Sequence, residues 1–65
     1  NMNIIVNGKN IEFSGTIQEL IKKYKLDDTA IAVERNGEII HREEYSSTNI
    51  EESDKIELVN FVGGG

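Results

Sequence analysis

The chain contains no cysteine and no proline among its 65 residues. Without cysteine it can form no disulfide, bind no metal through a thiolate and use no thiol as a nucleophile. It therefore needs no oxidising compartment to keep its shape. The chain also lacks an apolar run of about 18 residues and the layout of a signal peptide, so we expect a cytoplasmic protein that neither spans a membrane nor is secreted.

Basic residues are few. Seven Lys and Arg residues stand against twelve Asp and Glu residues, which gives a net charge of −5. Because the cations are also scattered, the chain has no stripe for binding phosphates, and nucleic acid is not an expected partner. The acidity either keeps the protein soluble or steers it toward a basic partner surface, and both interpretations stay open.

The length of the chain limits the kind of function that it can have. A chain this short forms one domain with one small core. A buried active-site cleft would take up most of that core, so a self-contained enzyme is not expected. The only histidine, His41, is interpreted as a solvated side chain at a strand end. Three adjacent acidic pairs are interpreted as solvated charge rather than metal ligands. These pairs are Asp27-Asp28, Glu43-Glu44 and Glu51-Glu52.

Two segments of the chain are predicted to be β-hairpins. Residues 2–13 alternate apolar and polar side chains around the turn dipeptide Asn7-Gly8. Residues 30–41 contain a second such dipeptide, Asn36-Gly37. Both residues of an Asn-Gly pair tolerate the positive φ that a two-residue hairpin turn requires.

Between the hairpins the hydrophobic period changes to that of a helix. Thr16, followed three residues later by Glu19, forms a capping box that places the start of the helix at Ile17. The helix is expected to run for about nine residues and to end near Lys25. Its buried face is predicted to consist of Ile17, Leu20, Ile21 and Tyr24.

A polar stretch and a last strand complete the chain. Residues 42–54 are polar and irregular, with Ile50 as the expected anchor into the core. Residues 55–62 follow as the last strand. The order of hairpin, helix, hairpin, loop and strand predicts an α+β fold with one helix on one face of a mixed sheet, because neither element can bury its apolar side alone.

Three stretches of the sequence carry a resemblance to a known family. They are the opening MNIIVNGK, the central AIAVERNGEII followed by Arg42, and the ending SDKIELVNFVGGG. With the chain length and the order of elements, they make the chain similar to the ubiquitin-like β-grasp proteins and, among these, to the thiamine-biosynthesis sulfur carriers. The resemblance spans Met2 to Gly65. This family often has a tryptophan where Tyr45 stands and a glycine where Ser53 stands.

The resemblance has consequences for the fold. It implies a mixed sheet of about five strands, with the first and last strands parallel at its centre and the second hairpin beside the last strand. It also implies a ubiquitin-like β-grasp domain over residues 1–62 and a flexible glycine tail over residues 63–65. No side chain in that tail can offset the entropy cost of ordering it.

The reactive group that the sequence suggests is the terminal carboxylate of Gly65. It is ionised at neutral pH and is therefore a poor electrophile, so it must first be activated, most economically as an acyl-adenylate made from ATP. The chain has no nucleotide-binding motif, so another protein must activate it. Gly64 is expected to be required as well, because a tail without Cβ atoms can thread a narrow channel. Sulfur delivered to the acyl-adenylate would give a thiocarboxylate, whereas a cysteine of the partner would pass the acyl group to an amine.

The resemblance selects the thiocarboxylate. It implies activation by an adenylating enzyme of the ubiquitin-activating type that uses ATP and Mg²⁺, sulfur from a cysteine desulfurase route, and delivery to thiazole synthase for the thiazole ring of thiamine. The chain itself would bind no cofactor or metal and would be a monomeric carrier, a co-substrate rather than an enzyme. The alternatives are the small subunit of molybdopterin synthase, whose tail usually has a proline and an alanine before Gly-Gly, a protein-conjugated modifier, and a ubiquitin-like binding module.

The last strand also predicts a docking surface. Ile56 and Leu58 are expected to face the core, because the opposite choice would bury Glu57 without a partner. Val59 and Phe61 are then exposed, and with an outward residue of the first strand they are expected to form one apolar patch that both partners contact. The predicted partner-binding residues are Ile5, Val59, Phe61, Val62 and Gly63.

Overall fold

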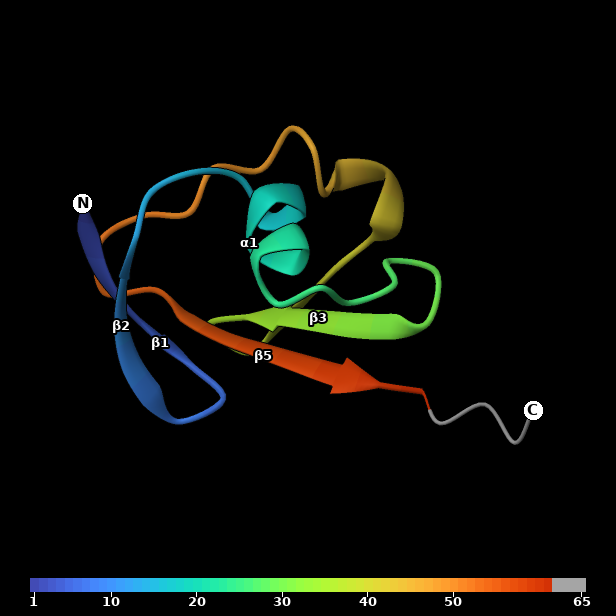
Figure 1. Cartoon of the computed structure of the whole chain (residues 1–65), viewed down its shortest axis with the longest axis horizontal. Coiled ribbons are helices and arrows are strands. Elements are labelled where there is room, and N and C mark those ends of the chain that lie inside the picture. The colour runs from blue at the N-terminus through green and yellow to red at the C-terminus, as the bar shows by residue number, and fades with distance from the viewer. Residues whose placement is uncertain (62–65) are drawn as a thin grey trace.

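The computed structural model describes residues 1–61, and residues 62–65 lie outside the described part of the chain. Five strands form one mixed sheet in the order β2-β1-β5-β3-β4, and an α-helix lies across one face of it (Figure 1). The elements are β1 (Met2–Val6), β2 (Lys9–Phe13), α1 (Ile17–Lys23), β3 (Ile31–Arg35), β4 (Glu38–Ile40), a 3₁₀ helix (Arg42–Glu44) and β5 (Lys55–Asn60). The predicted α+β fold and order of elements are confirmed. Within residues 1–61, no helix has the length and apolar character needed to cross a membrane.

β5 lies at the centre of the sheet because the two hairpins flank it. β1 pairs antiparallel with β2 and parallel with β5, whereas β3 pairs antiparallel with both β4 and β5. Both hairpins turn at the predicted Asn-Gly pairs, and all four turn residues have positive φ, between 48° and 86°. The parallel pairing of the first and last strands is therefore confirmed.

The helix α1 begins at Ile17, as the capping box predicts. The Thr16 hydroxyl accepts a hydrogen bond from the N–H of Glu19 at 3.2 Å, and the Glu19 carboxylate accepts one from the N–H of Thr16 at 2.8 Å. These bonds satisfy N–H groups that have no partner within the helix. The N–H of Ile17 donates to the carbonyl oxygen of Thr48 at 3.0 Å. The long polar loop is thus tied to the first turn of the helix.

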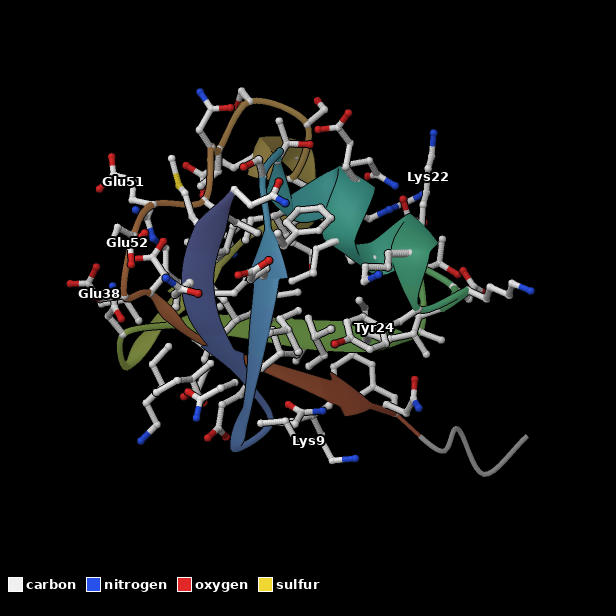
Figure 2. The ribbon with its side chains drawn as sticks, turned by 60° about the vertical axis from the view of Figure 1, so that its left-hand side comes forward. Lys9, Lys22, Tyr24, Glu38, Glu51 and Glu52 are labelled. Atoms are coloured by element: carbon white, nitrogen blue, oxygen red, sulfur yellow. The ribbon has the colours of Figure 1, made fainter. Side chains whose placement is uncertain are left out.

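The helix ends earlier than predicted, because the chain leaves it through a Schellman motif. Lys25 has a φ of 57°. Its N–H donates to the carbonyl oxygen of Lys22 at 2.9 Å, and the N–H of Leu26 donates to that of Ile21 at 3.1 Å. The motif reverses the chain, and Leu26 packs against the core. Tyr24 was predicted on the buried face, but it projects from the end of the helix and is 40% exposed (Figure 2).

The core lies between α1 and the covered face of the sheet. The polar loop contributes two buried side chains to it: Ile50, as predicted, and Tyr45, which no periodic pattern marks. The loop therefore closes the core on the side that neither the helix nor the sheet covers. The buried residues are Ile4, Val6, Ile17, Leu20, Ile21, Ile31, Val33, Tyr45, Ile50, Ile56 and Leu58.

Candidate functional site at the end of β5

The side chain of Asn7 holds β5 at the point where β1 stops. Its Oδ1 accepts a hydrogen bond from the N–H of Leu58 at 2.8 Å, and its Nδ2 donates to the carbonyl oxygen of Leu58 at 3.2 Å. The side-chain amide of Asn7 thus makes the two hydrogen bonds with Leu58 that the main chain of one further β1 residue would make. Asn7 also has the positive φ that the turn requires, 48°. One residue thus turns the first hairpin and lengthens its pairing with β5.

A second turn asparagine, Asn36, holds the start of β5. Its Oδ1 accepts from the N–H of Lys55 at 2.9 Å, and its Nδ2 donates to Oδ1 of Asp54 at 3.0 Å. Asp54 is buried, and its Oδ2 accepts from the N–H of Glu51 at 2.8 Å and lies 2.9 Å from Nε of Arg35. A carboxylate tolerates burial only with such partners. These contacts fix the place where β5 begins.

β5 extends beyond β1 and carries the chain to the rim of the sheet (Figure 1). β1 pairs with only the first two residues of β5, whereas β3 pairs with it as far as Asn60. The N–H of Phe61 still donates to the carbonyl oxygen of Ala30, at 2.7 Å. The strand is therefore held along β3 up to the last described residue. The predicted site residues Val62, Gly63, Gly64 and Gly65 follow from there and lie outside the described part of the chain.

The predicted alternation of side chains along β5 is confirmed. Ile56 and Leu58 are buried, whereas Val59 and Phe61 are 52% and 58% exposed. The exposed pair lies on the open face, which is the face of the sheet that α1 does not cover. Val59 is directly opposite Ala32 of β3 on this face. Apolar side chains are therefore presented to solvent just before the tail.

Ile5 does not belong to this apolar surface, so that part of the predicted patch is wrong. Ile5 is half-buried and lies opposite Lys55, at the start of β5. Val59 is four residues beyond Lys55 on the same strand, which is about 13 Å from Lys55. Alternation assigned Ile5 to the correct face but cannot give the register of a parallel pair. The prediction also missed Ile39 of β4, which is 55% exposed, although its alternation with Ile40 could have indicated it.

The other candidates for chemistry form no site in the described structure. His41 is exposed. Among residues 1–61, no group of His, Asp and Glu side chains is placed to hold a metal ion, and the surface of this part of the chain has no pocket. Burial raises the pKa of the Tyr45 phenol, with help from the Asp28 carboxylate and against the effect of Arg42. We interpret this shift as a consequence of packing, because Tyr45 is a core residue.

The fold and the exposed end of β5 are compatible with several families of ubiquitin-like proteins. The family model of ThiS matches residues 4–65, from β1 to the last glycine. The chain belongs to the ThiS family.

Individual ThiS proteins agree with this assignment. The sulfur carrier protein ThiS of Bacillus subtilis is 44% identical over 63 residues, which are 92% of this chain and 96% of that protein. The crystal structure of ThiS from Geobacter metallireducens is similar with a TM-score of 0.83 at 35% identity, over 98% of this chain and 100% of that one. The predicted β-grasp fold is thus confirmed. A longer relative is the thiazole synthase of Paramagnetospirillum magneticum, which is 36% identical over 66 residues, 98% of this chain but only 20% of that protein.

The structure describes the two positions at which the family resemblance led us to expect other residues. Tyr45, in the place of a tryptophan, is a large buried side chain of the core. Ser53, in the place of a glycine, has a φ of 70°. Its N–H donates to the carbonyl oxygen of Asn3 at 2.8 Å, so the loop needs this conformation for its contact with β1. Glycine adopts it freely, whereas serine adopts it at a cost in energy.

Proposed function

We propose that this ThiS chain is a sulfur carrier of thiamine biosynthesis and that the carboxylate of Gly65 carries the sulfur. The observation that supports this most strongly is the extent of the family match, which runs to residue 65 and so includes the tail. The geometry of β5 supports it as well. Asn7 and Asn36 hold this strand from both sides, and β3 accompanies it to Phe61, so the tail departs from a fixed point.

The proposed chemistry takes place on the main-chain end. A carboxylate oxygen of Gly65 attacks the α-phosphorus of ATP in the adenylating enzyme, and pyrophosphate leaves with its Mg²⁺ ion. The terminal sulfur of a cysteine persulfide then attacks the acyl carbon, and AMP leaves. A second thiol attacks the sulfur–sulfur bond, which releases the Gly65 thiocarboxylate and leaves a disulfide on the donor side. The carrier has no cysteine of its own, so the sulfur resides on the terminal carboxyl group.

Two partners follow from this chemistry, an adenylating enzyme of the ubiquitin-activating type and thiazole synthase. A stretch similar to nearly all of this chain lies within a thiazole synthase, which supports a direct contact between carrier and synthase. Both partners must reach the tail, and both are expected to contact Val59 and Phe61 on the open face. Exposed apolar side chains that gather beside a reactive group are typical of an interaction surface.

The role of the tail is tested by the intact mass of the full chain after incubation with the adenylating enzyme, ATP, Mg²⁺ and a sulfur donor. We expect one oxygen to be replaced by sulfur. Deletion of Gly65, or Gly64→Leu, should abolish this change while far-UV circular dichroism stays the same. Normal adenylation of a chain without both residues would refute the proposal. A ladder of protein conjugates would indicate a modifier, and sulfur transfer to a molybdopterin precursor would indicate the related synthase subunit.

The docking surface is tested by Val59→Asp and Phe61→Asp. Each variant should weaken binding to both partners by about tenfold or more, because a charge is placed in a contact that excludes water. Tyr24→Asp is the matched control, since Tyr24 is also an exposed aromatic residue but projects from the end of α1 (Figure 2). It should bind both partners normally. If the β5 variants unfolded, yet bound normally whenever folded, the assignment of the open face would be wrong.

A further inference from the structure

Two carboxylates lie directly opposite each other on the open face of the sheet. Glu34 of β3 pairs with Glu57 of β5, and their neighbours Val33, Ile56 and Leu58 are buried on the other face, in the core. Like charges at directly opposed positions of antiparallel strands repel each other. Neither carboxylate forms an ion pair with any side chain of residues 1–61, and this includes Lys55, at the adjacent outward position of β5. The fold therefore keeps a repulsive pair that it does not neutralise.

Apolar side chains border this Glu34–Glu57 pair on two sides, toward β4 and toward the end of β5, whereas Lys55 has the next outward position in the other direction. Ile39 of β4 lies directly opposite Glu34 on the other side of β3 and is largely exposed. One step closer to the tail, Val59 and Ala32 form the next pair on the same face. The arrangement is a small charged centre with an apolar border, which is the composition expected of a surface that a partner covers.

We infer that the Glu34–Glu57 pair receives a basic side chain of thiazole synthase, an arginine, when the carrier docks to deliver its sulfur. The inference rests on the proposed function and adds the contact that recognises this partner. The planar guanidinium group presents five N–H donors and can bridge two carboxylates, which a single ammonium group does less well. The apolar border excludes water from the contact and so strengthens the attraction. The repulsion between the two glutamates is relieved only in the complex.

The length of the tail places this contact within the partner's reach. Residues 62–65 span at most about 14 Å when fully extended. An enzyme that acts on Gly65 must therefore approach the end of β5 closely, and the open face begins there with Phe61 and Val59. Thiazole synthase is the partner that we assign, because a stretch similar to this chain lies within a protein of that activity.

The test compares two double variants of the full chain that remove the same number of charges. Glu34→Gln with Glu57→Gln removes the proposed contact. Glu12→Gln with Glu38→Gln is the control: Glu12 lies on β2, and Figure 2 shows Glu38 at the opposite end of the molecule from the last residues of β5. Calorimetric titration with thiazole synthase at low and high salt should show about tenfold weaker binding at low salt for the first variant only. Its affinity should also depend less on salt.

Thermal unfolding serves as the check on the fold. The Glu34→Gln/Glu57→Gln variant should be at least as stable as the control variant, because the repulsion between the glutamates is gone. Unchanged affinity, or equal weakening in both double variants, would overturn the inference. Weaker binding to the adenylating enzyme alone would overturn the assignment of the partner.

The inference and the proposed function fail in different experiments. Thiocarboxylation of Gly65, measured by intact mass in the unchanged chain, tests the function without reference to the glutamates. A chain that gains sulfur normally, but whose affinity for thiazole synthase does not depend on the Glu34–Glu57 pair, overturns the inference and leaves the function in place. A chain that never gains sulfur overturns the function.

Discussion

Replacement of Asn7 with aspartate tests whether the turn asparagine holds β5. The change preserves the shape of the side chain, and aspartate tolerates the positive φ of this position, 48°. It removes one donor, because the Nδ2 group that donates to the carbonyl oxygen of Leu58 at 3.2 Å becomes an oxygen. The bond from the N–H of Leu58 to Oδ1 at 2.8 Å remains possible. The variant therefore removes one hydrogen bond and places a negative charge beside the carbonyl oxygen that it leaves without a donor.

The expected loss in the free energy of unfolding depends on how deeply that hydrogen bond is buried. A lost hydrogen bond costs about 0.5–1.5 kcal/mol, and an unsatisfied buried acceptor costs about 1–3 kcal/mol. The bond from Asn7 to Leu58 is only partly buried, so we expect the free energy of unfolding to fall by about 1–2 kcal/mol. In a domain of this size, that lowers the Tm by about 4–16 °C.

The measurement is urea or thermal unfolding followed by far-UV circular dichroism. Asn10→Asp is the matched control, because it adds the same charge on β2 at an exposed side chain that forms no hydrogen bond with residues 1–61. It should change stability by no more than about 0.5 kcal/mol. If Asn7→Asp were no more destabilising than Asn10→Asp, the argument would fail. Amide exchange adds a local readout: the Leu58 N–H should exchange faster in Asn7→Gly, which loses both bonds, than in Asn7→Asp.

Two further predictions concern the polar loop. Ser53→Gly should raise the free energy of unfolding by about 0.5–1 kcal/mol, because a left-handed residue with a Cβ costs about 1–2 kcal/mol and the extra freedom of glycine in the unfolded chain offsets part of the gain. Ser46→Gly, at a residue without positive φ, should lower it in the same denaturant titration. Burial and Asp28 raise the pKa of Tyr45, so its neutral phenol stabilises the fold below the unfolded pKa of about 10, and this stabilisation is lost as the pH rises through the folded pKa. Tyr45→Phe should therefore make the alkaline loss of stability less steep, and an unchanged slope would contradict the reasoning.

Features with a local cause could be predicted from the sequence. The Asn-Gly pairs fix both turns because few residues tolerate their φ values. The capping box of Thr16 and Glu19 fixes the start of the helix by satisfying its first N–H groups. The alternation along β5 fixes which side chains face the core, since the other choice would bury Glu57.

Features that arise from packing between distant segments could not be predicted. Lys25 ends the helix in a conformation for which glycine is the usual sequence signal. Tyr45 stands in a polar run without a period, so nothing local marks it as a core residue. The distance between Ile5 and Val59 depends on the register of β1 against β5, which the contacts of the whole sheet determine.

One part of the candidate site could likewise be predicted from the sequence, and another part could not. The chemistry proposed for Gly65 rests on the sequence alone, because residues 62–65 lie outside the described part of the chain. The surface beside it does not follow from the sequence, because the Glu34–Glu57 pair exists only through the register of β3 against β5. In the sequence, Glu34 and Glu57 are far apart, and each simply occupies an outward position of an alternating strand.

The proposed carrier function requires that the open face near the end of β5 stay free for partners. In a small domain this weakens the fold, because Val59 and Phe61 add nothing to the core and the Glu34–Glu57 pair is repulsive. The hydrogen bonds of Asn7 and Asn36 to the main chain of β5 offset this loss of stability, and they leave the outward side chains of the strand free. Stability and recognition therefore use different groups on the same strand. It follows that a variant such as Asn7→Asp should lower stability while the folded protein still binds both partners normally, whereas a change of the Glu34–Glu57 pair should weaken binding to one partner and spare the fold.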